Sequence, residues 1–285
     1  MGADIERRRT IRIRRSSLAN NKLADMDRPS IKIAEDLNDY AEAFRIVYEA
    51  YREVGYILEP HPSQMQYSIF SMLPTTCVFV FKQYLKPIST LTQVLDSELF
   101  GLPMDNLYKK EVDELRRQGR KVAEIGALAT SKESRWNNLL MFLGKAYFQY
   151  AKLIGVNDIL ITVNPKHVEF YKAIFLFEPF AEERHYSYVG APAVALRINY
   201  DLFWERLENT FHEHDFETDL YTFFSRIHST GIDESMQFSV ERNNPLPQND
   251  AAFFFRQRPE ILQSLTPEQV AYIKKYYPEA FFYAH

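Results

Sequence analysis

Apolar and polar residues recur along the first two thirds of the chain with the periods of both helices and strands. Apolar side chains spaced three and four apart between about Asn38 and Val54 predict an amphipathic helix, and Gly55 supplies its C-terminal stop. Two runs rich in β-branched and aromatic residues, Thr75–Gln83 and Lys86–Ser97, predict an antiparallel hairpin.

The segments that follow continue to alternate between strands and helices. Lys121–Thr130 is almost continuously apolar, as expected of a strand covered on both faces. Asn164 and Pro165 are typical of the N-cap and first residue of a helix. The order β-α-β-β-α-β-α-β-α-β-β indicates an α/β fold. Strands are expected at 31–34, 75–83, 86–97, 121–130, 158–164, 176–180 and 191–199, and helices at 38–54, 104–118, 136–154 and 165–174.

After residue 199 the pattern changes to acidic and aromatic helical segments. Thr266, Pro267 and Gln269 form the capping-box pattern of a last helix, and a polar stretch at Arg242–Asp250 divides the region. We expect a core domain over 31–199 and a helical C-terminal extension over 200–285. The extension could be a lid, a dimer element or a small subdomain.

Composition and charge restrict the class of protein. The chain has 285 residues, 46% of them apolar, which is enough for a large core, and its apolar stretches are too short to cross a bilayer. The one cysteine, Cys77, excludes an internal disulfide, so we expect a cytoplasmic protein. Residues 1–30 hold eight Lys and Arg against four Asp and Glu. We interpret them as a basic disordered arm, although such an arm could attract an acidic partner.

One segment carries a family resemblance. The run Val163–Phe180, VNPKHVEFYKAIFLFEPF, resembles the C-terminal motif of the GCN5-related N-acetyltransferase (GNAT) fold. The strand Lys121–Thr130 with the long helix after it resembles the donor-binding strand and helix of that fold. This resemblance implies a GNAT-like mixed, mainly antiparallel sheet flanked by helices.

A closer resemblance is to the N-acyl amino acid synthases of the FeeM type, which are relatives of the acyl-homoserine-lactone synthases. Phe44–Ile57, Glu124–Thr130 and Asn164–Phe177 carry it, and it covers roughly residues 31–199. It implies an N-acyltransferase that moves a long-chain acyl group from acyl carrier protein to the amine of an amino acid. It also implies no tightly bound cofactor, because the donor is an acyl-phosphopantetheine.

Two departures from these families bear on the donor and the product. Enzymes that use coenzyme A cradle its diphosphate on a glycine-rich loop, whereas Ser131–Leu140 contains no glycine. A carrier protein is therefore the favoured donor, with acyl-CoA as the alternative. The resemblance places Val47 where lactone synthases carry an arginine, which disfavours lactone chemistry.

Acyl transfer to an amine needs a base, an acid and polarisation of the thioester carbonyl. Glu124 is the candidate base because desolvation in an apolar strand raises the pKa of a carboxyl. It could instead pair with Arg120 or Lys121. By the resemblance, Tyr171 is the candidate acid that protonates the leaving thiolate, although a buried core tyrosine is equally common.

The residues that follow Glu124 are candidates for donor binding. Small side chains would let the strand bulge and offer backbone N–H groups to the thioester or the pantetheine amides, and tight packing under the next helix is compatible with this role. Asn164 joins the set and could be only a helix cap. The candidates for binding the thioester and pantetheine are Gly126, Ala127, Leu128, Ala129 and Asn164.

Basic residues provide two further hypotheses. A cluster around one helix could dock an acidic carrier protein or be an ordinary solvated surface. It consists of Lys109, Lys110, Arg116, Arg117, Arg120 and Lys121. No pattern marks the clamp for the acceptor's carboxylate, and Arg52, Arg135 and Arg184 are candidates of equal rank. The 22 phenylalanines and 18 tyrosines could line an acyl channel or form an ordinary core.

Other clusters carry less weight. His212 to Asp215 contains metal-capable residues but lacks the i, i+4 spacing of helical zinc motifs, so we expect no metal. Cys77 is expected to be a buried apolar residue. We expect no nucleic-acid partner. The alternative functions are an acetyl-CoA-dependent GNAT acetyltransferase and a non-catalytic GNAT-like module that binds lipids or a partner.

Overall fold

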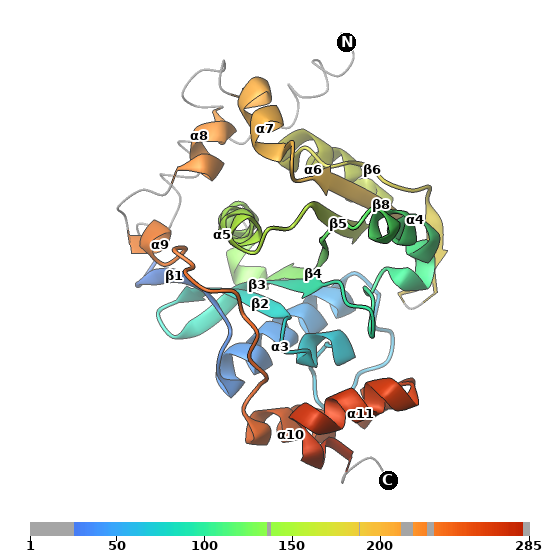
Figure 1. Ribbon diagram of the computed structural model, residues 1–285. Coiled ribbons are helices and arrows are strands. Elements are labelled where there is room, and N and C mark those ends of the chain that lie inside the picture. Colours follow the sequence, from blue (N-terminus) through green and yellow to red (C-terminus); the bar gives the residue numbers. More distant parts are fainter. Residues whose placement is uncertain (1–25, 136–137, 188, 212–218, 227–230, 282–285) are drawn as a thin grey trace.

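A mixed sheet forms the centre of the molecule in the computed structural model, which describes residues 26–135, 138–187, 189–211, 219–226 and 231–281 (Figure 1). The strand order is β1-β2-β3-β4-β5-β8-β6, and β7 pairs with β8. Neighbouring strands are antiparallel except β4 and β5, which are parallel. The strands are β1 (Pro29–Ile33), β2 (Cys77–Gln83), β3 (Lys86–Leu95), β4 (Val122–Thr130), β5 (Asp158–Val163), β6 (Glu178–Pro179), β7 (Arg184–Tyr186) and β8 (Ala191–Asn199).

Helices cover both faces of this sheet (Figure 1). One core cluster joins the sheet to α5, α6, α7 and α8, and another joins it to α3, α10 and α11, while α4 packs on a third cluster over β4 and β5. The α-helices are α3 (Leu37–Glu53), α4 (Asp105–Arg117), α5 (Leu139–Leu153), α6 (Val168–Phe175), α7 (Phe203–Phe211), α8 (Leu220–Ser225), α9 (Gly231–Glu234), α10 (Gln248–Gln257) and α11 (Pro267–Tyr276). Short 3-10 turns lie at η1 (Ile69–Met72), η2 (Lys132–Ser134), η3 (Pro165–His167), η4 (Pro259–Leu262) and η5 (Pro278–Phe281).

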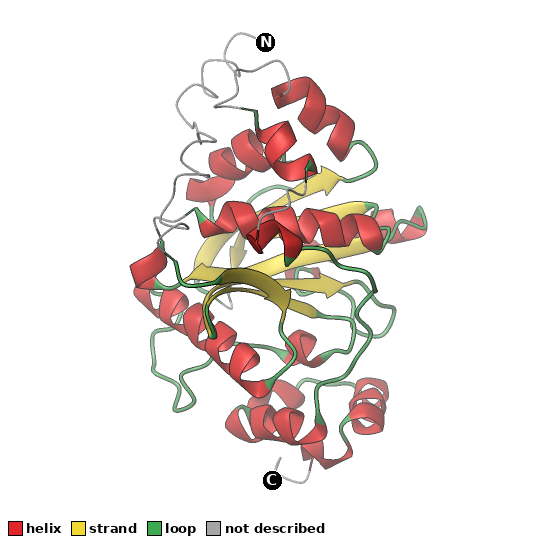
Figure 2. Cartoon of the chain, turned by 90° about the vertical axis from the view of Figure 1, so that its left-hand side faces the viewer, coloured by secondary structure: helices red, strands yellow, loops and turns green. Residues whose placement is uncertain are grey.

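The region after β8 packs on the core at both ends of the molecule (Figure 2). On the α5 side, Lys145 of α5 donates to both carboxylate oxygens of Asp233 in α9 at 2.9 Å. On the α3 side, the Tyr67 hydroxyl donates to the backbone oxygen of Phe254 in α10 at 2.7 Å. The described parts of the extension therefore extend two separate cores of the domain.

The predicted fold class is confirmed, including the mainly antiparallel sheet, its helices and the helical C-terminal region. Gly55 has a φ of +80° directly after α3, and Thr266 and Gln269 form the predicted capping box of α11. The short strand β7 was not predicted because its three residues carry no alternating pattern. No described helix has the length and apolar character that a membrane crossing requires.

Candidate active site

The parallel strands β4 and β5 separate part of the way along their length. Their pairing runs from Val122 with Asp158 to Ile125 with Ile161, after which β4 continues to Thr130 without pairing with β5. The edge of β4 that faces β5 therefore has backbone groups without a strand partner beyond Ile125. A gap of this kind can hold a bound group between two strands.

A bulge lies directly after the point of separation. Gly126 pairs with Thr92 of β3 and Ala129 pairs with Thr90, so two residues of β4 lie opposite one residue of β3. Ala127 has a φ of +47°, which is unusual for a residue with a Cβ. The bulge predicted from the small residues is present, while the binding role of these residues stays a prediction.

Open space adjoins Gly126. An ideal Cβ built on this residue meets no atom within 4 Å. Because side chains alternate between the faces of a strand, this space lies on the same face of the sheet as Glu124.

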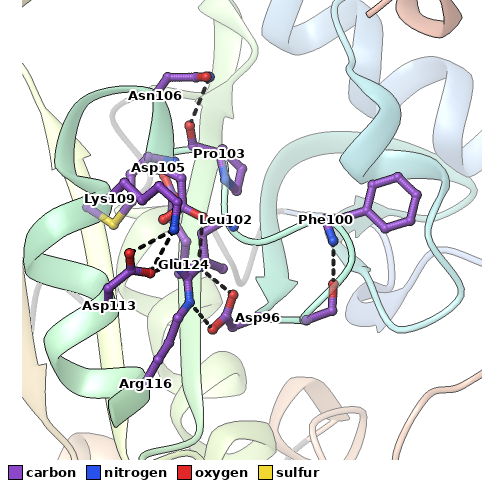
Figure 3. A network of polar contacts seen from close by, with 12 residues as sticks. Asp96, Phe100, Leu102, Pro103, Asp105, Asn106, Lys109, Asp113, Arg116 and Glu124 are labelled. Atoms are coloured by element: carbon purple, nitrogen blue, oxygen red, sulfur yellow. Dashed lines mark hydrogen bonds and ion pairs between the residues drawn. The ribbon is translucent and has the colours of Figure 1, made fainter. Parts of the chain in front are cut away.

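Glu124 is the buried carboxyl of the site (Figure 3). Its side chain lies on the α4 face of the sheet and is 7% exposed, and its Oε2 accepts a hydrogen bond from the backbone N–H of Met104 at 2.8 Å. The pKa of Glu124 is raised from 4.5 to about 8, mainly by burial; the Met104 N–H opposes this rise, and the negative charge of Asp105 contributes to it. A carboxyl with this pKa can accept a proton near neutral pH.

The alternative partners expected for Glu124 lie elsewhere. Arg120 pairs with Asp158 and with Asp201, whose Oδ2 lies at 2.9 Å. Lys121 donates to the backbone oxygen of Ile154 at 2.7 Å and pairs with Glu241. The interpretation of Glu124 as a strand-end ion pair is therefore wrong.

Tyr171 lies on the other side of the sheet. It belongs to the core cluster on the α5 face, together with Ala123 and Ile125 of β4. Its ring packs edge-on against Phe177, and burial raises the pKa of its hydroxyl above the usual range. The hydroxyl therefore carries its proton at neutral pH, so it can donate that proton to a leaving group but cannot act as a phenolate base.

Two other polar side chains near the gap were not singled out from the sequence. Thr162 directly follows the last residue of β5 that pairs with β4, on the same face as Glu124, and its Oγ1 is buried without a hydrogen-bond partner. Gln93 pairs with Ile125 and is fully buried, with both amide atoms unpartnered. The sequence signal that could have identified them is a polar residue inside an apolar strand, Thr162 in β5 and Gln93 in β3.

Asn164 ends β5 as a helix cap. Its side chain accepts a hydrogen bond from the backbone N–H of Lys166 at 3.2 Å, which confirms the predicted N-cap. Its amide nitrogen also lies 3.4 Å from the hydroxyl of Tyr56.

A pocket of about 460 Å³ lies at the far end of β4. Two of the three arginines proposed for the acceptor's carboxylate, Arg52 and Arg135, line it together with Lys132. Arg135 pairs with Glu53 at 2.7 Å, whereas Arg52 and Lys132 form no ion pair within the described parts of the chain. The complete lining is Ile46, Tyr48, Glu49, Ala50, Arg52, Glu53, Pro60, Gln64, Thr130, Ser131, Lys132 and Arg135.

The third arginine lies elsewhere. Arg184 of β7 pairs with Glu111 and stacks on the ring of Tyr108 at 4.7 Å. It is thus tied to α4 and does not line the pocket.

Most of the predicted basic docking cluster is paired within the protein. Arg116 contacts three carboxylates, and Arg120 contacts two. The exposed side chains Lys109 and Arg117 pair with Asp113 and Glu114 on the same helix. Lys110 is exposed. The six residues therefore present far fewer uncompensated cations than their number implies.

Two further predictions concern residues outside the gap. Cys77 is fully buried and burial raises the pKa of its thiol to about 11, as expected of an unreactive core residue. His212 to Asp215 lies outside the described residues.

The separated parallel strands, the bulge and the two flanking helix layers agree with the GNAT-like fold expected from the sequence. The family model of the N-acyl amino acid synthase FeeM matches residues 42–199, more than half of the chain, and this chain belongs to that family. No curated protein matches it in sequence.

Three solved structures are similar to part of this chain. FeeM, an N-acyl amino acid synthase from uncultured soil microbes, is 25% identical with a TM-score of 0.55, and the match covers 62% of this chain and 94% of that one. The acyl-homoserine-lactone synthase LasI is 13% identical with a TM-score of 0.46, over 61% of this chain and 91% of its own. The CoA-dependent acyl-homoserine-lactone synthase BjaI is 11% identical with a TM-score of 0.48, over 62% and 89%.

Proposed function

We propose that this enzyme transfers a long-chain acyl group from acyl carrier protein to the amine of an amino acid. The observation that carries the proposal is the open space beside Gly126, two residues along the strand from the buried carboxyl of Glu124 and at the point where β4 leaves β5. A thioester placed there lies beside a base and beside unpaired backbone N–H groups. Membership of the N-acyl amino acid synthase family supports the amino-acid acceptor.

In this proposal the two candidate catalytic residues act on different sides of the thioester. Glu124 takes a proton from the attacking amine, and the tetrahedral intermediate forms against the free edge of β4, whose N–H groups stabilise its oxyanion. Collapse of the intermediate breaks the C–S bond, and Tyr171 donates its proton to the leaving thiolate. The products are an N-acyl amino acid and the phosphopantetheine thiol of the carrier protein, and exchange with solvent then removes the proton from Glu124 and restores that of Tyr171.

The length of the donor arm links the gap to the pocket. Gly126 and Ser131 are five positions apart along the chain, which spans at most about 16 Å because the bulge shortens this part of β4. The arm from the sulfur to the phosphate of phosphopantetheine has about 13 bonds, and spans roughly 15 Å when extended. A donor arm that runs along β4 from a thioester beside Gly126 is therefore long enough to bring its phosphate to Arg52 and Lys132 at the pocket.

The same distances favour the donor over the acceptor as the ligand of the cations in the pocket. Thr130 lies six residues beyond Glu124 on β4, about 20 Å in an extended strand, which is longer than an amino acid. A carboxylate held by Arg52 or Arg135 would leave the α-amine of an ordinary amino acid far from Glu124. We assign Arg52 and Lys132 to the phosphate of the donor, and neither Arg52 nor Arg135 to the acceptor's carboxylate. Side-chain cations then replace the glycine loop that binds a diphosphate.

The donor and the acceptor can be tested together. Acyl chains from C12 to C18 are each presented to the purified enzyme in two forms, on acyl carrier protein and on coenzyme A. Each donor is tested with every amino acid, and the products are detected by mass spectrometry. We expect a higher kcat/KM with the carrier protein. Arg52→Gln and Lys132→Gln should raise KM for the donor with little change in kcat, whereas Lys110→Gln on α4 should change neither. Equal use of acetyl-CoA would contradict the proposal.

A further inference from the structure

The hydrogen bond that Glu124 accepts comes from a tightly closed turn before α4 (Figure 3). In this turn, the backbone N–H of Leu102 donates to Oδ2 of Asp105 at 3.0 Å, and the backbone N–H of Asp105 donates to the backbone oxygen of Leu102 at 3.0 Å. Asp105 thus closes the turn with both its side chain and its backbone. Met104, whose N–H reaches Glu124, lies inside the closed turn.

Gly101 provides the room that this turn needs. Its φ is +64°, and an ideal Cβ built on it would lie 2.1 Å from Oδ2 of Asp105. A side chain here would displace the carboxylate from Leu102 as well as straining the backbone. Glycine at this position is therefore coupled to the Asp105 contact.

Arg116, in the last turn of α4, fixes the same carboxylate. Its Nη2 donates to Oδ2 of Asp105 at 2.7 Å, and the same guanidinium contacts Asp96 and Asp113. Lys109 also pairs with Asp113. Three carboxylates and two cations leave this network with a charge of −1 beside Glu124. Oδ1 of Asp105 is itself buried without a hydrogen-bond partner.

The other neighbours of Glu124 carry no charge. Val94 of β3 and Leu160 of β5 flank it in the sheet. On the α4 side, the hydroxyl of Tyr108 is directed away, since it donates to the backbone oxygens of Ala193 and Glu182. Asp105 is the charged group whose field acts on Glu124.

We propose that Asp105 is a positioning residue for Glu124. Its carboxylate closes the turn that directs the Met104 N–H at Glu124, and its charge disfavours a second negative charge at the base. Gly101 and Arg116 hold Asp105 in this place. The inference rests on the proposed function, because that function makes Glu124 the base. The position and the pKa of Glu124 can nevertheless be measured without donor or acceptor.

The test is a titration of Glu124 by NMR. Glutamate carboxyl groups are labelled with ¹³C, and the resonance lost in Glu124→Gln identifies Glu124. Asp105→Asn keeps the shape of the turn and removes the charge, so the pKa of Glu124 should fall by about 1 unit. Asp113→Asn removes the charge of another carboxylate that pairs with Arg116. This variant should leave the pKa of Glu124 within about 0.3 units of the wild-type value. Equal shifts in the two variants, or no shift in Asp105→Asn, would overturn the proposal.

A second measurement uses the turn itself. In the unmodified enzyme, the amide resonance of Met104 should titrate with the same midpoint as the Glu124 carboxyl. Gly101→Ala should accelerate hydrogen exchange of the Met104 amide at least about tenfold relative to the wild type. A Met104 amide that neither titrates nor responds to Gly101→Ala would contradict the inference. If these signals behave as expected while Glu124→Gln retains full acyl transfer, the positioning stands and the catalytic assignment fails.

Discussion

Glu124 and Tyr171 face opposite sides of the central sheet. Glu124 contacts the turn before α4, whereas Tyr171 packs with Ala123 and Ile125 in the core beneath α5. Both residues can act on one substrate only if its reacting group lies in the gap where β4 leaves β5. In the proposed mechanism, this arrangement separates the proposed base for the amine from the proposed acid for the thiolate, so that one does not neutralise the other.

Tyr171→Phe removes the proposed acid and keeps the ring in its aromatic surroundings. We expect kcat to fall about 10²-fold with little change in the melting temperature. The loss should be smaller for donors whose thiol is more acidic, because such a thiolate leaves without help. Steady-state kinetics with matched acyl thioesters measure this. Equal losses for all leaving groups would contradict the assignment of Tyr171 as the acid.

Gly126→Ala tests the open space beside the strand. The added Cβ meets no atom within 4 Å in the free enzyme, so stability should be unchanged or slightly increased. The same methyl group would occupy the place proposed for the thioester, and we expect kcat/KM to fall about tenfold or more, with a larger loss for Gly126→Val. Thermal denaturation and kinetics on the same preparations separate the two effects. Full activity in both variants would show that no reacting group binds there.

The raised pKa of Glu124 predicts how stability depends on pH. In the unfolded chain this carboxyl titrates near 4.5, and in the folded enzyme near 8, so the folded state binds more protons between these values. The contribution of Glu124 to stability is therefore complete below pH 4.5 and is lost as the pH rises to about 8.

Glu124→Gln removes this dependence. The difference in free energy of unfolding between the wild type and Glu124→Gln should change in favour of the variant from pH 4.5 to pH 8, as measured by urea denaturation. Glu114→Gln, at an exposed position of α4, is the control and should show no such trend. A constant difference across this range would mean that Glu124 has an ordinary pKa.

The buried ion pair between Lys145 and Asp233 tests how the extension is attached. Lys145 and Asp233 are 1% and 5% exposed in their side chains, so Lys145→Met leaves a buried carboxylate without this cation and should cost about 3–5 kcal/mol. Adding Asp233→Leu should recover most of the loss. Lys109→Met, in an exposed pair, should cost less than about 1 kcal/mol. A double variant no more stable than Lys145→Met would contradict a buried pair.

The fold was largely predictable because local patterns of apolar and capping residues mark most of its strands and helices. The candidate base was also predictable, since Glu124 is the one charge embedded in the apolar run Lys121–Thr130. Its partner was not, because the Met104 N–H lies 20 residues away in a turn without a pattern of its own.

The ion pairs of the basic residues were the least predictable feature. Sequence gives the density of positive charge around α4, but Arg116 and Arg120 are paired with carboxylates that only the fold brings near. The pocket could not be predicted either, because the fold brings together two cations that lie far apart in the sequence, Arg52 at the end of α3 and Lys132 after β4. Charge counts along the chain therefore could not show which cations are already paired within the protein, and the docking role of the α4 residues stays a prediction.

The central claim is that Glu124 accepts the proton of an amine that attacks a thioester in the β4–β5 gap. The most direct measurement is the single-turnover rate of acyl transfer from acyl carrier protein as a function of pH, for the wild type and Glu124→Gln. We predict that the wild-type rate rises with a midpoint near pH 8, and that Glu124→Gln is slower by about 10²–10⁴-fold without that midpoint. A Glu124→Gln enzyme with the wild-type rate and the same pH profile would contradict the account.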